Sequence, residues 1–140
     1  MKVLAIDYGD ARTGIAISDY TGLLVGTTDV IHSRKPDVTA REIARLAREH
    51  GAQRLVMGFP RNMDGTEGQQ AIDTRAFGDA LRERVELPIR YVDERLTSMS
   101  AHSMLHEGGL KRKDHKKVVD KVAAVLILQT YMQNPARSQE

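Results

Sequence analysis

The first residues that could do chemistry lie close to the N-terminus. Asp7 ends an apolar run and begins the pattern Asp7-x-Gly9-x-x-Arg12-x-Gly14-x-Ala16. An acid at the carboxyl end of a buried strand stands where parallel sheets usually place functional groups. Gly9 permits a tight turn and the close approach of a phosphate or metal to the backbone. An acid at a strand end is more often only a turn former, so the residues that follow Asp7 make it a candidate ligand.

Two further acidic positions are candidates. The run Asp93–Arg95 follows an apolar segment, and strand alternation directs its two acids to opposite faces of a sheet unless the strand has already ended. Asp120 stands inside a predicted helix, where aspartate is a poor helix former. The small side chains of Ala123 and Ala124 would let that helix lie close to the sheet and bring Asp120 towards Asp7. Salt bridges to neighbouring basic residues are the alternative explanation for both positions.

Charge is distributed unevenly along the chain. The net charge is +2, but residues 1–30 carry two basic and four acidic side chains, whereas residues 111–121 carry six basic and two acidic ones. An acidic start and a basic end within one small chain suggest a metal site beside a segment that binds a polyanion. Gly108 and Gly109 would make the basic segment a mobile flap. The alternative is that the basic run is only a solvated face.

Composition excludes several classes of chemistry. The chain of 140 residues contains no cysteine, which rules out disulfides, thiolate zinc sites and cysteine nucleophiles. His102 and His106 have the spacing of a metal pair, but surface histidines are the favoured interpretation. The longest apolar run, Val122–Leu128, is far too short to span a membrane, and the N-terminus lacks the apolar region of a signal peptide. We therefore expect a cytoplasmic protein with no membrane partner.

The hydrophobic pattern predicts a single domain over residues 1–133 and a disordered polar tail over 134–140. We expect a helix over 37–50 and another that starts at the capping box Thr66-x-x-Gln69 and ends near Val85. A third helix is expected from Thr97 or Ser98 to Gly109, and a fourth over about His115–Met132, buried against the sheet. The second helix is expected to turn four apolar side chains inward, namely Ile72, Ala76, Ala80 and Leu81. Five strands are predicted, at Lys2–Tyr8, Thr13–Asp19, Leu23–Ile31, Arg54–Phe59 and Ile89–Asp93.

The order of these elements predicts an α/β fold. Three strands joined by short links and followed by strand–helix–strand units give a mixed sheet with helices on its faces. The first, fourth and fifth strands should be parallel to one another. Their carboxyl ends would then meet at one edge of the sheet, where Asp7 lies.

Four sequence blocks together resemble one known family. Asp7–Ala16, Gly58–Gly65 (GFPRNMDG), Asp93–Ser98 (DERLTS) and Lys116–Leu128 (KKVVDKVAAVLIL) closely resemble the YqgF/RuvX family. Members of that family are described as candidate Holliday junction resolvases and pre-16S rRNA nucleases. The resemblance covers essentially the whole chain. It implies a ribonuclease H-like sheet in the order 3-2-1-4-5, with strand 2 antiparallel and helices on both faces.

The resemblance also implies a site. Asp7, Glu94 and Asp120 become the catalytic residues and ligands of Mg²⁺ or Mn²⁺, because carboxylates without histidine or cysteine favour hard cations. Two such ions would activate water and stabilise the leaving oxygen. Whether Asp64 joins or replaces Glu94 stays open. The expected contacts to nucleic acid are Arg12, Asn62, Arg95, Lys111, Arg112, Lys113, Lys116 and Lys117.

Several functions are compatible with these features. The implied role is maturation of the 5′ end of pre-16S rRNA, with ribosomal precursor particles as possible partners, and resolution of branched DNA is the alternative. Neither monomer nor homodimer is favoured. An actin-type nucleotide-binding kinase also begins with Asp-x-Gly, but such proteins duplicate this fold and 140 residues hold one copy. The remaining alternative is a non-catalytic nucleic-acid-binding protein of ribosome assembly.

Overall fold

The computed structural model describes residues 1–94 and 112–135, with the side chains of 112–120 left outside the description. Five strands form one sheet: β1 (Val3–Asp7), β2 (Arg12–Ser18), β3 (Val25–His32), β4 (Arg54–Phe59) and β5 (Ile89–Asp93). Three helices accompany them: α1 (Pro36–His50), α2 (Gln69–Arg82) and α4 (Arg112–Gln133). The five predicted strands are confirmed. The helix expected before Gly109 lies outside the described residues, as does most of the predicted tail.

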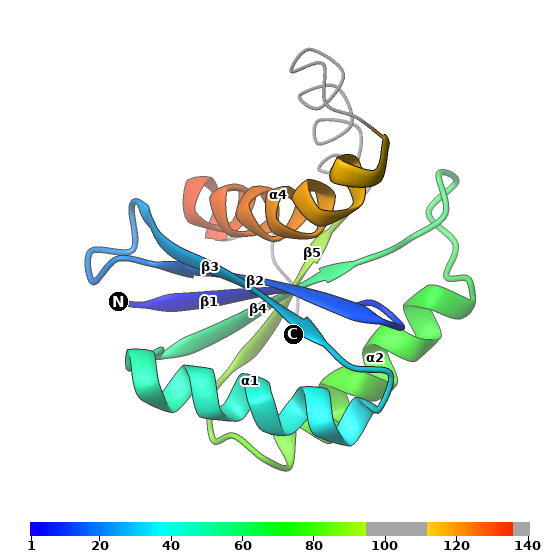
Figure 1. The fold of residues 1–140 in the computed structure, drawn as a ribbon. Helices are drawn as coiled ribbons and strands as arrows, with labels where there is room; N and C mark the ends of the chain where they lie inside the picture. Colours follow the sequence, from blue (N-terminus) through cyan, green and yellow to red (C-terminus); the bar gives the residue numbers. More distant parts are fainter. Residues whose placement is uncertain (95–111, 136–140) are drawn as a thin grey trace.

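The sheet has the order β3-β2-β1-β4-β5. β2 runs antiparallel to both β1 and β3, whereas β1, β4 and β5 are parallel. Helices α1 and α2 cover one face of the sheet and α4 crosses the other (Figure 1). This arrangement confirms the predicted mixed α/β sheet with helices on both faces.

Strand alternation divides the core into two layers. Leu4 and Ile6 of β1 pack with the residues that α1 and α2 bury, whereas Val3 and Ala5 face the opposite way and pack against α4. The second layer also contains the buried face of α4, formed by Ala124, Ile127, Leu128 and Tyr131. The expectation that the last helix lies buried against the sheet is thus confirmed for this face. Successive side chains of β1 therefore alternate between the two layers, and every second residue belongs to the same layer.

The predicted orientation of α2 is wrong. Ile72 is 56% exposed and Leu81 alone of the four expected inward residues is buried. The helix instead buries a face of mostly small side chains around one aromatic ring, namely Ala71, Thr74, Phe77, Gly78 and Leu81. Small residues allow the helix to lie close to the sheet, which outweighs the hydrophobicity of a single isoleucine.

The predicted start of α2 is also wrong. Its N-cap is Gly68 and no side chain caps it. The Thr66 hydroxyl instead donates a hydrogen bond to Asp64 Oδ1 at 2.6 Å, inside the preceding loop. Thr66 therefore stabilises the turn before α2 through its side chain and does not cap the helix in the way that the capping-box pattern predicted. Among residues 1–94 and 112–135, no helix combines the length and apolar character needed to cross a membrane.

Candidate active site

Three positions at the carboxyl end of the sheet share the face covered by α4. Asp7 lies two residues after Ala5, which packs against α4, and so points the same way. Gly58 lies two residues after Val56, and Glu94 lies two residues after Val92. Val56 and Val92 both belong to the core layer under α4. Ile6 pairs with Met57 in register, so Asp7 and Gly58 are the next neighbours across the sheet. The three positions thus run side by side from β1 across β4 to the end of β5.

Gly58 allows Glu94 to reach Asp7. A Cβ atom on Gly58 would lie 2.3 Å from Glu94 Oε1 and 2.6 Å from Ile127 Cδ1, closer than real Cβ atoms approach. The Glu94 side chain therefore passes over β4 in the space that the glycine leaves beneath α4. Its carboxyl group comes into hydrogen-bonding contact with that of Asp7. The backbone of Glu94 is fixed beside the end of β4, because its N–H donates a hydrogen bond to the Phe59 carbonyl at 3.0 Å.

The environment of Glu94 disfavours its negative charge. Burial raises the pKa of the Glu94 carboxyl, the hydrogen bond with Asp7 lowers it in part, and the charge of Asp93 raises it further. Desolvation penalises the ionised form because the protein interior solvates a carboxylate less well than water does. Two carboxyl groups in this position are stabilised either by a proton or by a cation.

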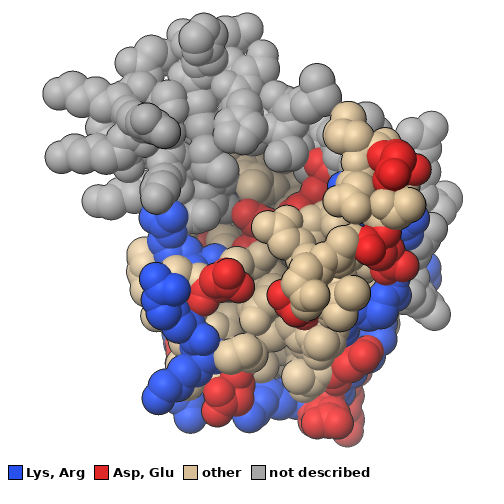
Figure 2. All heavy atoms as spheres, turned by 90° about the vertical axis from the view of Figure 1, so that its right-hand side faces the viewer, with Lys and Arg blue, Asp and Glu red and all other residues tan. Residues whose placement is uncertain are grey.

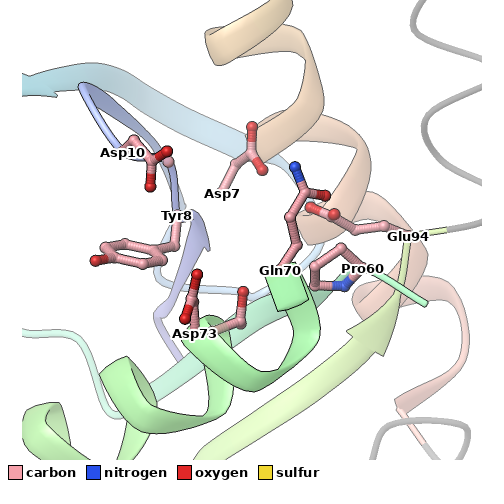
Figure 3. A pocket seen from close by; sticks show the side chains of 9 residues that line it. Asp7, Tyr8, Asp10, Pro60, Gln70, Asp73 and Glu94 are labelled. Carbon is pink, nitrogen blue, oxygen red and sulfur yellow. The ribbon is translucent and has the colours of Figure 1, made fainter. Parts of the chain in front are cut away.

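A cavity of about 220 Å³ opens in front of the acidic pair. It lies beyond the carboxyl ends of β1 and β4, and the first turns of α2 form one of its walls. This is the usual position of ligand sites in open α/β sheets. Gln70 extends from α2 towards Asp7 and Glu94 (Figure 3). The lining residues are Asp7, Tyr8, Gly9, Asp10, Pro60, Gln70, Asp73, Thr74 and Glu94.

The donor set fits a hard divalent cation. Carboxylate oxygens of Asp7 and Glu94 face the same cavity, which also offers the amide of Gln70. Mg²⁺ binds one or two carboxylates in proteins and keeps several waters. Within the described part of the chain, no three acidic or histidine side chains form a metal-binding group. Asp120 lies on α4, but its side chain is outside the description, so its role as third ligand stays a prediction.

The loop after β4 holds Asp64 outside the lining of the cavity. Asp64 Oδ1 accepts hydrogen bonds from the backbone N–H and hydroxyl of Thr66. Asn62 donates from Nδ2 to the same hydroxyl at 3.0 Å. The loop is therefore held by its own side chains. The structure brings Glu94, and not Asp64, to Asp7.

The other predicted contacts are only partly described. Arg12 begins β2 and is half-buried. Arg95 and Lys111 lie outside the described residues, as do His102 and His106. The remaining four predicted contacts occupy the first turns of α4, with side chains outside the description: Arg112, Lys113, Lys116 and Lys117. Their contacts to nucleic acid stay predictions.

The tight turn expected at Gly9 is confirmed, whereas the close approach of a phosphate or metal to its backbone stays a prediction. A Cβ atom there would lie 2.4 Å from the Arg12 carbonyl oxygen, so the glycine lets the chain turn back into β2. The space it leaves is used by the protein's own backbone.

Sequence reasoning missed five polar residues of the cavity, Thr74 of α2 among them. Tyr8 and Asp10 lie in the turn after β1, and Gln70 and Asp73 lie in the first two turns of α2. The available signal was the helical spacing of Gln70, Asp73 and Phe77. It was hidden because Ile72 suggested a different inward face.

The molecular surface around the site is mixed in charge. Acidic and basic side chains alternate over the described face in Figure 2, with basic ones most prominent along its left edge and acidic ones both in the centre and at the right margin.

Substitution of Gly58 tests the passage of Glu94 over β4. Gly58→Ala should lower the free energy of unfolding by about 1–3 kcal/mol, because its methyl group clashes with Glu94 and Ile127. Glu94→Ala removes one of the two clashing side chains, so the double variant should lose less than the sum of the single losses. The difference is expected at roughly 0.5–3 kcal/mol in a double-mutant cycle followed by urea unfolding. Strictly additive losses would contradict the proximity of Gly58 and Glu94.

The raised pKa of Glu94 predicts a pH-dependent gain of stability in Glu94→Gln. A raised pKa means that the folded state binds the proton more tightly than the unfolded chain does, so stability falls as pH rises above the ordinary glutamate range. Glutamine lacks this titration. With divalent metal chelated, the variant should match the parent at about pH 4 and be more stable at about pH 7.5. Urea unfolding at both pH values measures the difference, with the exposed Glu86→Gln as control. An equal gain at both pH values would contradict the titration of a buried Glu94 carboxyl as its cause.

The chain is similar to known proteins over nearly its whole length. The family described as "RuvX: Holliday junction resolvase" matches residues 1–134. A protein from Acetivibrio thermocellus named "Putative pre-16S rRNA nuclease" is 41% identical over 139 residues, which cover 98% of this chain and 99% of that one. A protein of the same name from Chloroflexus aurantiacus is 39% identical over 142 residues, covering 99% and 93% of the two chains.

Solved structures share the fold at low sequence identity. Fowlpox virus resolvase in complex with Holliday junction DNA superposes with a TM-score of 0.61 at 12% identity, covering 97% of this chain and 99% of that one. Thermus thermophilus RuvC in complex with a Holliday junction superposes with a TM-score of 0.60 at 12% identity, covering 99% of this chain and 98% of that one. These likenesses establish the ribonuclease H-like, RuvC-like fold. With the family match over nearly the full chain, they show that this protein belongs to the RuvX family.

Proposed function

We propose that this protein is a metal-dependent nuclease that hydrolyses phosphodiester bonds of nucleic acid at the Asp7–Glu94 pair. The observation that carries the proposal is the passage of Glu94 over Gly58 to the carboxyl group of Asp7. A buried acidic pair costs folding free energy unless a proton or cation neutralises it. Its position at a cavity beyond the carboxyl ends of the parallel strands makes it accessible to a substrate.

We assign the third ligand to Asp120. Position 120 lies one helical turn before Ala124 and two turns before Ile127, so helical periodicity places it on the face of α4 that meets the sheet. Ile127 lies beside Gly58, directly above the path of Glu94. The same helical face, followed towards the N-terminus of α4, would bring the Asp120 carboxylate towards the acidic pair.

Each group has a defined task in hydrolysis. Bound Mg²⁺ or Mn²⁺ supplies charge stabilisation to the phosphoryl oxygens and lowers the pKa of water, and a pair of ions would act on both the attacking and leaving oxygens. Asp7, Glu94 and Asp120 would hold the cation. Gln70, which extends towards the pair, can orient water or a phosphate oxygen through its amide.

The names of the relatives favour an RNA substrate. The proteins from Acetivibrio thermocellus and Chloroflexus aurantiacus, with high coverage of both chains, are named for pre-16S rRNA. We therefore place the protein in maturation of the 5′ end of this RNA in the cytoplasm, with ribosomal precursor particles as partners. Junction DNA is the second candidate, supported by the description of the family and by the junction complexes of the two structural relatives. Resolution of a junction would require two sites in a symmetric dimer.

Cleavage of matched substrates tests the proposed activity. In Mg²⁺ or Mn²⁺, the protein should cut RNA that carries the 5′ precursor segment of 16S rRNA, and should cut junction DNA more slowly. Asp7→Asn and Asp120→Asn should reduce turnover on the order of 10²–10³-fold or more, as expected when stabilisation of transition-state charge is lost. Glu86→Gln, which removes an exposed acid far from the cavity, is the matched control. Preferential cleavage of the junction would reverse the substrate assignment, and metal-independent cleavage by all variants would reject the site.

Stability separates a ligand role of Asp120 from a structural one. Without metal, Asp120→Asn should be as stable as the parent or more stable, because it relieves repulsion among three carboxylates. A marked loss of thermal stability would indicate a salt bridge instead.

The basic start of α4 predicts a strong salt dependence of binding. Each phosphate neutralised contributes about 0.9 to the log–log salt slope on duplex and roughly 0.7 on single strands. Replacement of Lys111, Arg112 and Lys113 by alanine should lower the slope by about two to three units. Affinity should fall similarly for every sequence, because phosphate contacts carry no base information. A salt titration on one oligonucleotide measures this, and an unchanged slope would show that nucleic acid binds elsewhere.

A further inference from the structure

A second cavity adjoins the proposed active site. It has a volume of about 350 Å³ and shares Tyr8, Asp10 and Asp73 with the cavity of the acidic pair. Its other walls are apolar and come from α1 and α2, namely Pro36, Ala76, Phe77 and Ala80. This volume lies within the range of about 300–1,000 Å³ that is usual for small-molecule sites. We call this cavity the Tyr8 groove.

The Tyr8 groove contains a rigid aromatic surface. The Tyr8 ring stacks on Phe77 with a centroid separation of 4.0 Å and an angle of 9° between the planes. Phe77 is 3% exposed and belongs to the core, so it fixes the ring from one side. Tyr8 itself is only half-buried, which leaves part of the ring available to the groove. A fixed, partly exposed aromatic ring is the feature on which proteins stack unpaired bases.

The charge of the groove distinguishes a base from a phosphate. Asp10 and Asp73 lie on either side of Tyr8 (Figure 3). Two carboxylates repel phosphate, so the groove is unsuited to the backbone of a nucleic acid. Carboxylates accept hydrogen bonds and donate none, so they select a ligand edge that carries N–H donors. An aromatic platform with acceptors at its border therefore fits a nucleobase.

Asp10 is better placed than Asp73 to bind such an edge. Asp73 Oδ1 already accepts a hydrogen bond from Gln69 Nε2 at 2.9 Å. Asp10 is exposed and, among the described residues, accepts no hydrogen bond, so both of its oxygens can serve a ligand. Guanine presents N1–H and N2–H side by side on its Watson–Crick edge, which matches the two oxygens of one carboxylate. This edge is available only when the base is unpaired.

We propose that the Tyr8 groove binds one unpaired guanine of the substrate, stacked on Tyr8 and held at its Watson–Crick edge by Asp10. The inference rests on the proposed nuclease function, since it assigns the nucleotide next to the phosphate at Asp7 and Glu94. The exposed residues Arg34 and Lys35 directly precede Pro36 at the groove and are suited to the next phosphate along the strand. The groove thus makes a single-stranded guanine beside the cleavage point a specificity element.

Five RNA pentamers test the proposal. They have the sequence UUXUU, where X is guanosine, inosine, adenosine, cytidine or uridine, and carry the same phosphates and the same fluorescent label. Affinity is measured by fluorescence anisotropy with the full-length protein in EDTA, so that cleavage does not contribute. The guanosine pentamer should bind most tightly, on the order of tenfold better than the inosine pentamer, which lacks the N2 amino group. Equal affinity for all five pentamers would overturn the proposal.

Variants locate the effect. Tyr8→Leu should weaken the guanosine pentamer on the order of tenfold, and Tyr8→Phe should restore most of that affinity because it keeps the ring. Asp10→Asn should reduce the preference for guanosine over inosine to about twofold or less, since an amide offers one acceptor in place of two. Asp79→Asn, the matched control, removes the same charge from an exposed position of α2 outside the groove and should leave the preference intact. Loss of preference in Asp73→Asn alone would reject the assignment to Asp10.

Binding and cleavage give separate answers. Amide NMR shifts at Tyr8, Asp10 and Phe77 on addition of the guanosine pentamer should be larger than those with the uridine pentamer. If the parent cuts RNA but shows neither this difference nor a preference for guanosine, the groove proposal fails and the nuclease function stands. If guanosine is preferred and located in the groove but no substrate is cut, the nuclease function fails and the base site stands.

Discussion

The site depends on a side chain that crosses a neighbouring strand. Glu94 starts from the end of β5 and must pass β4 to reach Asp7 on β1. It can do so only because β4 has glycine at position 58, where any Cβ atom would occupy the path. Glycine weakens a strand and usually marks a close approach within a sheet. In this sheet the approaching group is a carboxylate, and α4 closes the path from above through Ile127.

This crossing sets a balance between stability and function. The carboxyl group of Glu94 is held beneath a helix and beside a second carboxyl group, where burial disfavours its charge. Most of the second layer is a packed apolar core that includes Val92 and Leu128. At this edge of the layer the side chains are acidic. A well-packed apolar side chain at position 94 would avoid the free-energy cost of burying a carboxylate. The presence of the carboxyl pair is therefore consistent with a site that a bound cation completes.

The two helical layers contribute different chemistry to one crevice. The face covered by α4 supplies the acidic pair and, at the start of that helix, positions rich in lysine and arginine. The face covered by α2 supplies Gln70, Asp73 and the ring of Phe77 beneath Tyr8. The cavity lies beyond the carboxyl ends of the parallel strands. Charge, hydrogen-bond acceptors and an aromatic surface therefore meet at one edge of the sheet, although they come from segments far apart in the sequence.

Apolar runs, turn residues and motif spacing are local signals, so they predicted the five strands, the mixed sheet and the place of Asp7 at the carboxyl end of the first strand. The sequence by itself did not determine that Glu94, and not Asp64, reaches Asp7, because the direction of a side chain across a sheet depends on the size of its neighbour on the next strand. Nor did it determine the face of α2, since a helix that packs closely buries small residues and leaves Ile72 outside. Tyr8, Asp10 and Asp73 became visible only when the turn after β1 and that face of α2 were placed together, since tertiary packing alone sets their separation.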